Sequence, residues 1–199
     1  MSDLADLQRD VRYLLDRTAI LDCIAAHARG CDRHDADLLC STYHDDGIDE
    51  HGTTVNSGPD YAQWANTVHA ATSRAHTHNV TTHLCEIDGD TAHCESYVLV
   101  GLLGPDARTV QLMSGRYIDR LEKRDGTWRI AVRRSTVEWS AAADASILTS
   151  PYFLRQGFAN GTRDTDDLSY RRPLCAETPA PARWAQASDS VPGSQEGPL

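Results

Sequence analysis

The second half of the chain contains long runs of strand-forming residues separated by tight turns, and this pattern restricts the possible folds most. Residues 77–87 are rich in β-branched side chains and end at Asp88 and Gly89, a pair typical of hairpin turns. Consecutive strands joined by such turns form an antiparallel meander. The expected strands cover residues 77–87, 91–103, 110–123 and 128–139, with turns at Asp88-Gly89, Gly104-Pro105 and Asp125-Gly126.

The first 75 residues carry apolar side chains at helical spacing instead. This spacing predicts a long helix over residues 4–30 with Gly30 as its stop signal, and a short helix opened by an Asp35 cap. A short hairpin over residues 48–55 and a helix over 61–71 follow. Helices followed by a meander indicate an α+β fold rather than an alternating α/β fold. We expect a cone-shaped α+β barrel, in which N-terminal helices pack on a strongly curved antiparallel sheet that encloses a pocket.

The length of 199 residues suits one domain with an extension. We expect residues 1–145 to form the cone. Residues 146–175 are mildly apolar in part, and we expect a C-terminal extension that acts as a lid or a dimer contact. Residues 176–199 repeat Pro, Ala, Ser and Gly, which predicts a flexible tail.

The charge balance limits the partners of the chain. A formal net charge of −10 repels phosphate backbones and anionic membranes, so we predict no nucleic-acid or membrane partner. The N-terminus lacks the pattern of a signal peptide, and no apolar run reaches the ~18 residues that span a bilayer, so we expect a cytoplasmic protein. The six cysteines include no CxxC pair and are interpreted as small buried hydrophobes.

Histidine is the side chain most easily tuned to move protons near neutral pH, and the chain contains nine. His78, near the start of the first long strand, can point into the mouth of the cone, close to Asp32 at the end of the first helix. A carboxylate there would accept the Nδ1–H of the imidazole and leave the other nitrogen as a general base. Two residues so far apart in sequence are a weak signal by themselves. His34, His44 and His69 are interpreted as helix-end or exposed residues without a role.

A metal site is the alternative interpretation of the histidines on this strand. Alternate strand residues share a face, so His76 and His78 could bind zinc together with a carboxylate. His83 has the opposite parity to both, and no second cluster has the spacing of metal ligands. We therefore predict no metal and no cofactor.

Two adjacent arginines stand in the last expected strand, where neighbouring side chains face opposite sides. Arg134 has the parity of Ile130, so we expect Arg134 rather than Arg133 to face inward. A buried guanidinium needs a partner, so the inward residue is either tied to a carboxylate or available to a developing negative charge. A salt bridge to Glu95 or Glu138 is the open structural alternative.

Several stretches together resemble the SnoaL-like branch of the nuclear transport factor 2-like superfamily, over about residues 5–140. They are Leu14-Leu-Asp-Arg-Thr-Ala-Ile-Leu-Asp-Cys-Ile, Arg29-Gly-Cys-Asp-Arg-His-Asp, Tyr43-His-Asp-Asp, Asp49-Glu-His-Gly, His78-Asn-Val-Thr-Thr-His-Leu through Asp88-Gly-Asp-Thr-Ala-His-Cys-Glu-Ser-Tyr, and Gly115-Arg-Tyr-Ile-Asp-Arg-Leu-Glu through Gly126-Thr-Trp-Arg-Ile. This group includes scytalone dehydratase, bile acid 7α-dehydratase and hexachlorocyclohexane dehydrochlorinase. The resemblance implies an Asp–His pair that removes a proton beside a leaving group, without metal or organic cofactor.

Carried over to this sequence, the resemblance assigns the pair to Asp32 and His78 and the last-strand arginine to Arg134. His27 stands about where related dehydratases have tyrosine or lysine, so the group that protonates a leaving hydroxyl stays open between His27 and Tyr43. The function implied is that of a cofactor-independent lyase of the dehydratase type, acting on an apolar cyclic substrate such as a steroid or polyketide.

Two alternatives remain at this point. The same dyad could serve an isomerase or cyclase, in which proton transfer occurs without elimination. The cone could also be a non-catalytic small-molecule-binding or partner subunit. The resemblance further implies a homo-oligomer, a dimer or trimer, formed through the outer face of the sheet.

Overall fold

The computed structural model describes residues 2–184, in which the three longest helices precede the four long strands. The helices are α1 (Ser2–Arg33), α2 (Ala36–Ser41), α3 (Gly58–Thr72) and α4 (Pro151–Leu154), with short 3-10 turns η1 (Ser146–Thr149) and η2 (Leu168–Tyr170). The strands are β1 (Tyr43–His51), β2 (Thr54–Ser57), β3 (Ala75–Asp88), β4 (Thr91–Leu103), β5 (Thr109–Arg124) and β6 (Thr127–Asp144).

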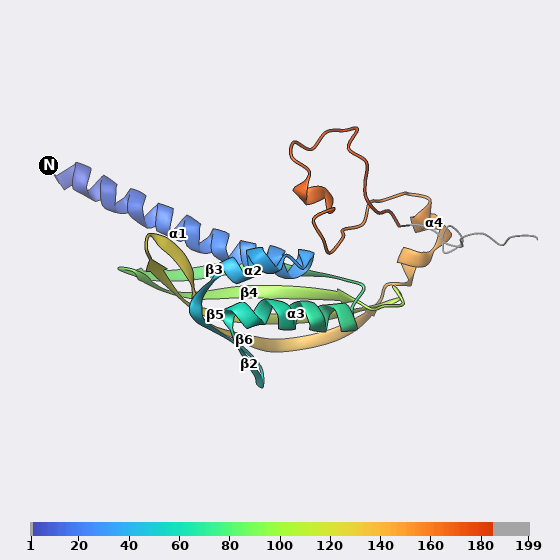
Figure 1. The fold of residues 1–199 in the computed structure, drawn as a ribbon, viewed down its shortest axis with the longest axis horizontal. Coiled ribbons are helices and arrows are strands. Elements are labelled where there is room, and N and C mark those ends of the chain that lie inside the picture. Colours follow the sequence, from blue (N-terminus) through green and yellow to red (C-terminus); the bar gives the residue numbers. More distant parts are fainter. Residues whose placement is uncertain (1, 185–199) are drawn as a thin grey trace, which may run out of the picture.

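The six strands form one curved, unclosed sheet in the order β2-β1-β6-β5-β4-β3. Strands β3 to β6 are the predicted antiparallel meander, and β1 joins β6 in parallel. Helix α1 packs on β3 and β6 and α3 packs on β1, while the first turns of α1 extend past the sheet (Figure 1). The α+β cone expected from the sequence is confirmed. None of the helices within residues 2–184 is long and apolar enough to cross a membrane.

Helix α1 runs past Gly30, the predicted stop, to Arg33. A Cβ on Gly30 would lie 2.9 Å from the Leu39 side chain, so glycine lets α2 pack closely on α1. The helix ends at His34, which has a φ of +52°. The His34 N–H bonds to the carbonyl of Cys31 and the Asp35 N–H to that of Gly30, the two hydrogen bonds of a Schellman cap.

The core lies between the helices and the concave face of the sheet. Ile20 and Ile24 of α1 meet Leu39, Leu121 and Ile130, and all five are fully buried. Burial of such side chains contributes about 1.5–3 kcal/mol each. Polar side chains lie buried in the same layer, and they build the candidate site.

The C-terminal extension contains only short helical turns and packs on the ends of α1 and α3. Arg33 forms an ion pair with Asp167 at 2.8 Å, and the Tyr170 hydroxyl donates to Asp35 at 2.6 Å. The roles of lid or dimer contact remain predictions. Of the flexible tail expected over residues 176–199, residues 185–199 lie outside the described part of the chain.

Candidate functional site

Asp32 and His78 are in direct contact. The last turn of α1 places the Asp32 carboxylate against the start of β3, where His78 Nδ1 lies 2.7 Å from Asp32 Oδ1. The backbone N–H of His78 donates to both carboxylate oxygens at 3.1 and 3.0 Å, so the strand itself holds the pair in register. The side chains are 7% and 13% exposed. Since Nδ1–H donates to the carboxylate, Nε2 carries the lone pair, and it has no hydrogen-bond partner within residues 2–184.

The inward arginine is Arg133, and the expectation that Arg134 faces inward is wrong. Leu121 pairs with Ile130 and Arg120 with Val132, so Ala131 is an extra residue in β6. This β-bulge reverses the side-chain parity after Ile130. Arg134 consequently lies on the outer face, paired with Glu50 at 2.8 Å.

The Arg133 guanidinium is fully buried and bound to Asp119, the residue opposite it on β5. Its Nε and Nη2 each donate to a different Asp119 oxygen at 2.7 Å. The Tyr117 ring lies 4.0 Å from the guanidinium carbon, a cation–π contact. Arg133 Nη1 is buried without a hydrogen-bond partner among the described residues, so one N–H group remains available to an acceptor. The partner is therefore Asp119, and neither Glu95 nor Glu138 contacts Arg133.

His27 and Tyr43 lie together, as their assignment to one region implied. His27 Nε2 is 3.1 Å from the Tyr43 hydroxyl, which donates to Asp49 at 2.7 Å. Because the Tyr43 proton points to Asp49, His27 donates from Nε2 and carries its lone pair on Nδ1. Nδ1 is buried and has no partner among the described residues. Asp49 also contacts His51 Nδ1 at 3.2 Å, and that imidazole is 36% exposed.

Both His27 and Tyr43 are held in their uncharged forms, mainly by burial. Burial, reinforced by the neighbouring Arg133, lowers the pKa of His27 well below its usual value. Burial raises the pKa of the Tyr43 phenol well above its usual range. The His27 ring stacks on Tyr61 at 5.4 Å between centroids and meets Tyr117 edge-on at 5.8 Å. The surroundings of His27 are thus aromatic and buried, which suits an apolar ligand.

A second group of histidines surrounds the dyad, and no pattern in the sequence places them together. His69, from the last turn of α3, lies 4.0 Å from His76 and 5.4 Å from His78 between ring centroids. His34 follows α1 and lies 5.5 Å from His76. The sequence-based interpretation of His34 and His69 as helix-end or exposed residues is therefore incomplete, because both rings contact His76. His44 is buried, not exposed, and contacts the Glu122 carbonyl at 2.9 Å.

The parity assigned to His83 also changes. A register shift between Val80 and His83 turns His83 toward the face that carries His78. His83 Nδ1 contacts the Ser96 hydroxyl at 2.9 Å rather than joining the dyad. Bulges of this kind leave no mark in single-residue propensities.

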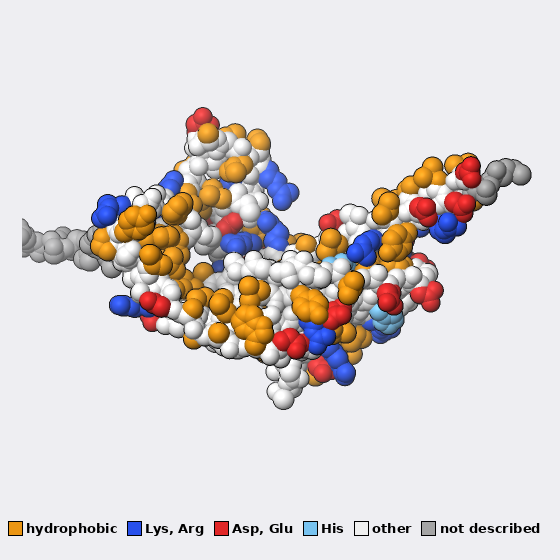
Figure 2. All heavy atoms as spheres, turned by 180° about the vertical axis from the view of Figure 1, so that it is seen from behind, with side chains coloured by type: hydrophobic (Ala, Val, Ile, Leu, Met, Phe, Trp, Pro, Cys, Tyr) orange, Lys and Arg blue, Asp and Glu red, His pale blue; other side chains and the backbone are white. Residues whose placement is uncertain are grey.

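A cavity of about 440 Å³ opens beside Asp32, between the start of β3 and residues 159–163 of the extension. In Figure 2 the surface is hollowed between the projecting α1 and the C-terminal extension. Arg163 reaches from the extension to His76, where its Nη2 donates to Nδ1 at 2.8 Å. The sequence did not single out Arg163, because the extension carries no pattern that predicts where it packs.

Comparison with curated proteins finds no match. Several solved structures are similar. A LinA type 3 hexachlorocyclohexane dehydrochlorinase from Novosphingobium barchaimii is 23% identical, with a TM-score of 0.62 over 67% of this chain and 94% of that one. A protein assigned provisionally as a scytalone dehydratase, from Novosphingobium aromaticivorans, is 18% identical, with a TM-score of 0.59 over 65% and 88% of the two chains.

A protein of unknown function from Mycobacterium tuberculosis is 29% identical, with a TM-score of 0.57 over 64% of this chain and 74% of that one. These likenesses agree with the order of helices and the curved sheet. The SnoaL-like domain family matches residues 12–134, the segment that contains α2, α3, the core of the sheet and both members of the Asp32–His78 pair. The chain belongs to the SnoaL-like domain family, within the nuclear transport factor 2-like superfamily.

Proposed function

We propose that the protein is a cofactor-independent lyase of the dehydratase type. The observation that carries this proposal is the 2.7 Å contact between Asp32 and His78, two residues that 46 positions of sequence separate. The carboxylate fixes the imidazole tautomer and stabilises the imidazolium that forms when Nε2 takes a proton from carbon. A positioned general base of this kind contributes about 10²–10⁴-fold to the rate.

Arg133 is the group proposed to stabilise the charge that develops when the proton leaves. Asp119 engages two of its nitrogens, and the remaining Nη1 is buried and unpaired. An N–H donor that is fixed before the reaction stabilises an enolate or a leaving group without reorganisation. This role passes from Arg134, which the resemblance favoured, to Arg133 because only the latter side chain is buried.

His27 is proposed to position the leaving hydroxyl, and His78 to protonate it. The Tyr43 hydroxyl donates to Asp49, so His27 keeps its proton on Nε2, and its Nδ1 lone pair accepts a hydrogen bond from the substrate hydroxyl. The proton that His78 Nε2 took from carbon passes to the hydroxyl, the C–O bond breaks, and water departs as the C=C bond forms, so His78 returns to its neutral form. The hydrogen-bonded row of His27, Tyr43, Asp49 and His51 supports this role, since it fixes the His27 tautomer.

The proposed substrate is an apolar cyclic molecule with a hydroxyl group β to a carbonyl. The tyrosine rings around His27 support this class, because they offer flat apolar surface with few hydrogen-bonding groups. Steroid and polyketide β-hydroxy ketones fit the description. Hexachlorocyclohexane is a useful additional probe, since it loses a proton and chloride without a carbonyl.

The test incubates the protein with a panel of cyclic β-hydroxy ketones and with hexachlorocyclohexane, and identifies products by mass spectrometry. Loss of water or of hydrogen chloride, abolished by His78→Gln, is the expected result. A product of unchanged mass would indicate an isomerase or cyclase instead. Turnover that His78→Gln leaves intact would refute the proposed base. His93→Gln, an exposed histidine on β4, is the matched control.

We also propose that the chain forms a homo-oligomer. Helix α1 exposes four apolar side chains at the spacing of one helical face, and Figure 2 shows hydrophobic side chains along this projecting helix. A second copy of the chain could cover this stripe and the outer face of the sheet, where Tyr97 and Ile118 are exposed. Sedimentation should give a dimer or trimer, and a monomer at micromolar concentration would contradict the proposal. The four side chains are Leu4, Leu7, Val11 and Leu14.

A further inference from the structure

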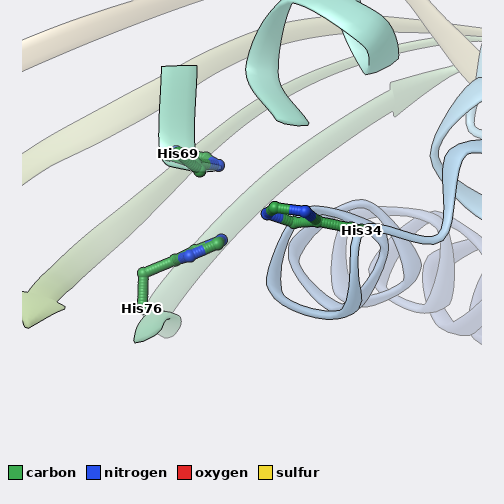
Figure 3. A group of neighbouring side chains, drawn as sticks. All are labelled: His34, His69 and His76. Atoms are coloured by element: carbon green, nitrogen blue, oxygen red, sulfur yellow. The ribbon is translucent and has the colours of Figure 1, made fainter. Parts of the chain in front are cut away.

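Three imidazoles from distant parts of the chain converge beside the dyad (Figure 3). His34 follows the end of α1, His69 lies in the last turn of α3, and His76 is the second residue of β3. One ring nitrogen from each lies within 4.8 Å of the other two. None of the three has a part in the proposed elimination.

Two of these rings have nitrogens that lack partners. His34 Nε2 and His69 Nδ1 are buried, and neither has a hydrogen-bond partner among the described residues. Leaving such a group unpaired costs about 1–3 kcal/mol. A ligand that accepts their lone pairs would remove this cost at both nitrogens together.

The backbone at His34 gives a second, independent indication. His34 has a φ of +52° and occupies the position after the helix end that glycine fills most often. A side chain in the left-handed region costs roughly 1–3 kcal/mol, and such residues cluster at functional sites. Glycine would cap α1 equally well, so the fold alone does not explain a histidine here.

We propose that His34, His69 and His76 bind a divalent transition metal of the zinc, cobalt or nickel class, with water as the fourth ligand. Neutral imidazoles are ligands that these ions favour. A tetrahedral zinc ion with nitrogens at about 2.0–2.1 Å holds them ~3.4 Å apart, so nitrogens that lie within 4.8 Å of one another must approach by at most about 1.4 Å. This proposal departs from the prediction of no metal, and it does not depend on the lyase proposal.

Arg163 opposes metal binding through its contact with His76. Both nitrogens of His76 are engaged, Nε2 with the Cys31 carbonyl at 3.0 Å and Nδ1 with Arg163 Nη2 at 2.8 Å. The ion must displace one of these partners, and its charge repels the guanidinium in either case. Metal binding and the docking of Arg163 therefore oppose each other.

The test titrates the metal-free full-length chain with zinc chloride by calorimetry and with cobalt chloride by visible absorption. One zinc ion per chain and the d–d bands of four-coordinate cobalt are expected. His34→Gly and His69→Ala should each weaken binding by more than the roughly 10–100-fold that losing an outer-shell partner costs. Arg163→Gln should tighten it about tenfold or more. His93→Ala, on the exposed side of β4, should change nothing.

His34→Gly keeps the variant folded, because glycine favours the cap conformation. Loss of binding in this variant, with its melting temperature retained, would isolate the imidazole as the cause. Absence of one-to-one binding in the wild-type chain would overturn the proposal. So would binding that both histidine substitutions leave unchanged, which would indicate adventitious surface binding.

Discussion

Replacing Arg133 by methionine tests the most unusual contact in the core. Methionine retains much of the apolar volume of arginine but removes the guanidinium, and Asp119 then lies buried without its partner. Both side chains are fully buried in the native protein, and two hydrogen bonds of 2.7 Å join them. Removing one member of such a pair typically costs about 3–5 kcal/mol, because an uncompensated charge remains in a medium of low polarity.

The double substitution Arg133→Met with Asp119→Leu separates the pair from the packing around it. With both charges gone, no buried charge is left unpaired, and the cost should be far smaller than the sum of the two single costs. Arg134→Met is the matched control. Its ion pair with Glu50 is on the surface, where the Arg134 side chain is 68% exposed, and such pairs contribute about 0–1 kcal/mol.

Urea unfolding followed by circular dichroism measures the free energy of unfolding of the wild type, of Arg133→Met, Asp119→Leu and their combination, and of the control Arg134→Met. We expect a large loss of stability for Arg133→Met, a small loss for Arg134→Met, and strong non-additivity between the substitutions at Arg133 and Asp119. Equal costs for the two arginine substitutions would show that the bulge at Ala131 does not select Arg133. Additive single costs would show that Asp119 is not its partner.

Three further predictions concern stability and reactivity. His27→Gln should reduce the loss of stability that the wild-type chain shows below pH 6.5. Because burial depresses the folded pKa of His27, its contribution to stability is present above the unfolded pKa, and the free energy of unfolding falls by up to about 1.4 kcal/mol per pH unit as pH drops. Melting curves of both proteins between pH 7 and pH 5 would measure this difference. Exposed Cys175 should be the first cysteine to react with a thiol reagent in the native protein. Buried Cys31, whose pKa burial raises to about 12, should react only when the protein unfolds. Early labelling of Cys31, detected by mass spectrometry, would contradict this. Gly115→Ala should lower the melting temperature, because its Cβ would lie 1.9 Å from the Thr136 carbonyl oxygen. An unchanged melting temperature would show that the β6 backbone can shift away from this contact without cost.

The sequence was sufficient for the meander, because each strand ends in a turn that constrains the backbone. Asp125 and Gly126 both adopt positive φ, as the primed hairpin turns require. The Asp35 cap also formed as expected, with its side chain accepting from Leu38 N–H. These features depend on neighbouring residues alone, so local chemistry predicts them.

The errors have one physical cause. The alternation of side chains along a strand predicts which face each one occupies only while the pairing with the next strand is regular. One extra residue, Ala131, exchanged the faces of Arg133 and Arg134. The same effect changed the side of His83. Whether a bulge forms depends on the neighbouring strand, so a residue-by-residue reading of β6 could not detect it.

The cluster of His34, His69 and His76 could not be predicted from the sequence for a different reason. His69 was known to lie near a helix end, but nothing in its surroundings indicated that this end faces β3. Arg163 joins the cluster from an extension without periodic pattern. Long-range placement of this kind follows from how the helices and the extension pack, whereas the Asp32–His78 pair could be named in advance because a family resemblance supplied the pairing.

Deuterium exchange at the α-carbon of cyclic ketones in heavy water, followed by proton NMR, tests directly whether His78 acts as a base. It reports proton abstraction alone and needs no leaving group. We expect the wild-type chain to accelerate exchange, His78→Gln to remove about 10²–10⁴-fold of that acceleration, and Asp32→Asn to impair it as well. Exchange that proceeds equally in the wild-type and His78→Gln proteins would contradict the assignment of His78 as the base.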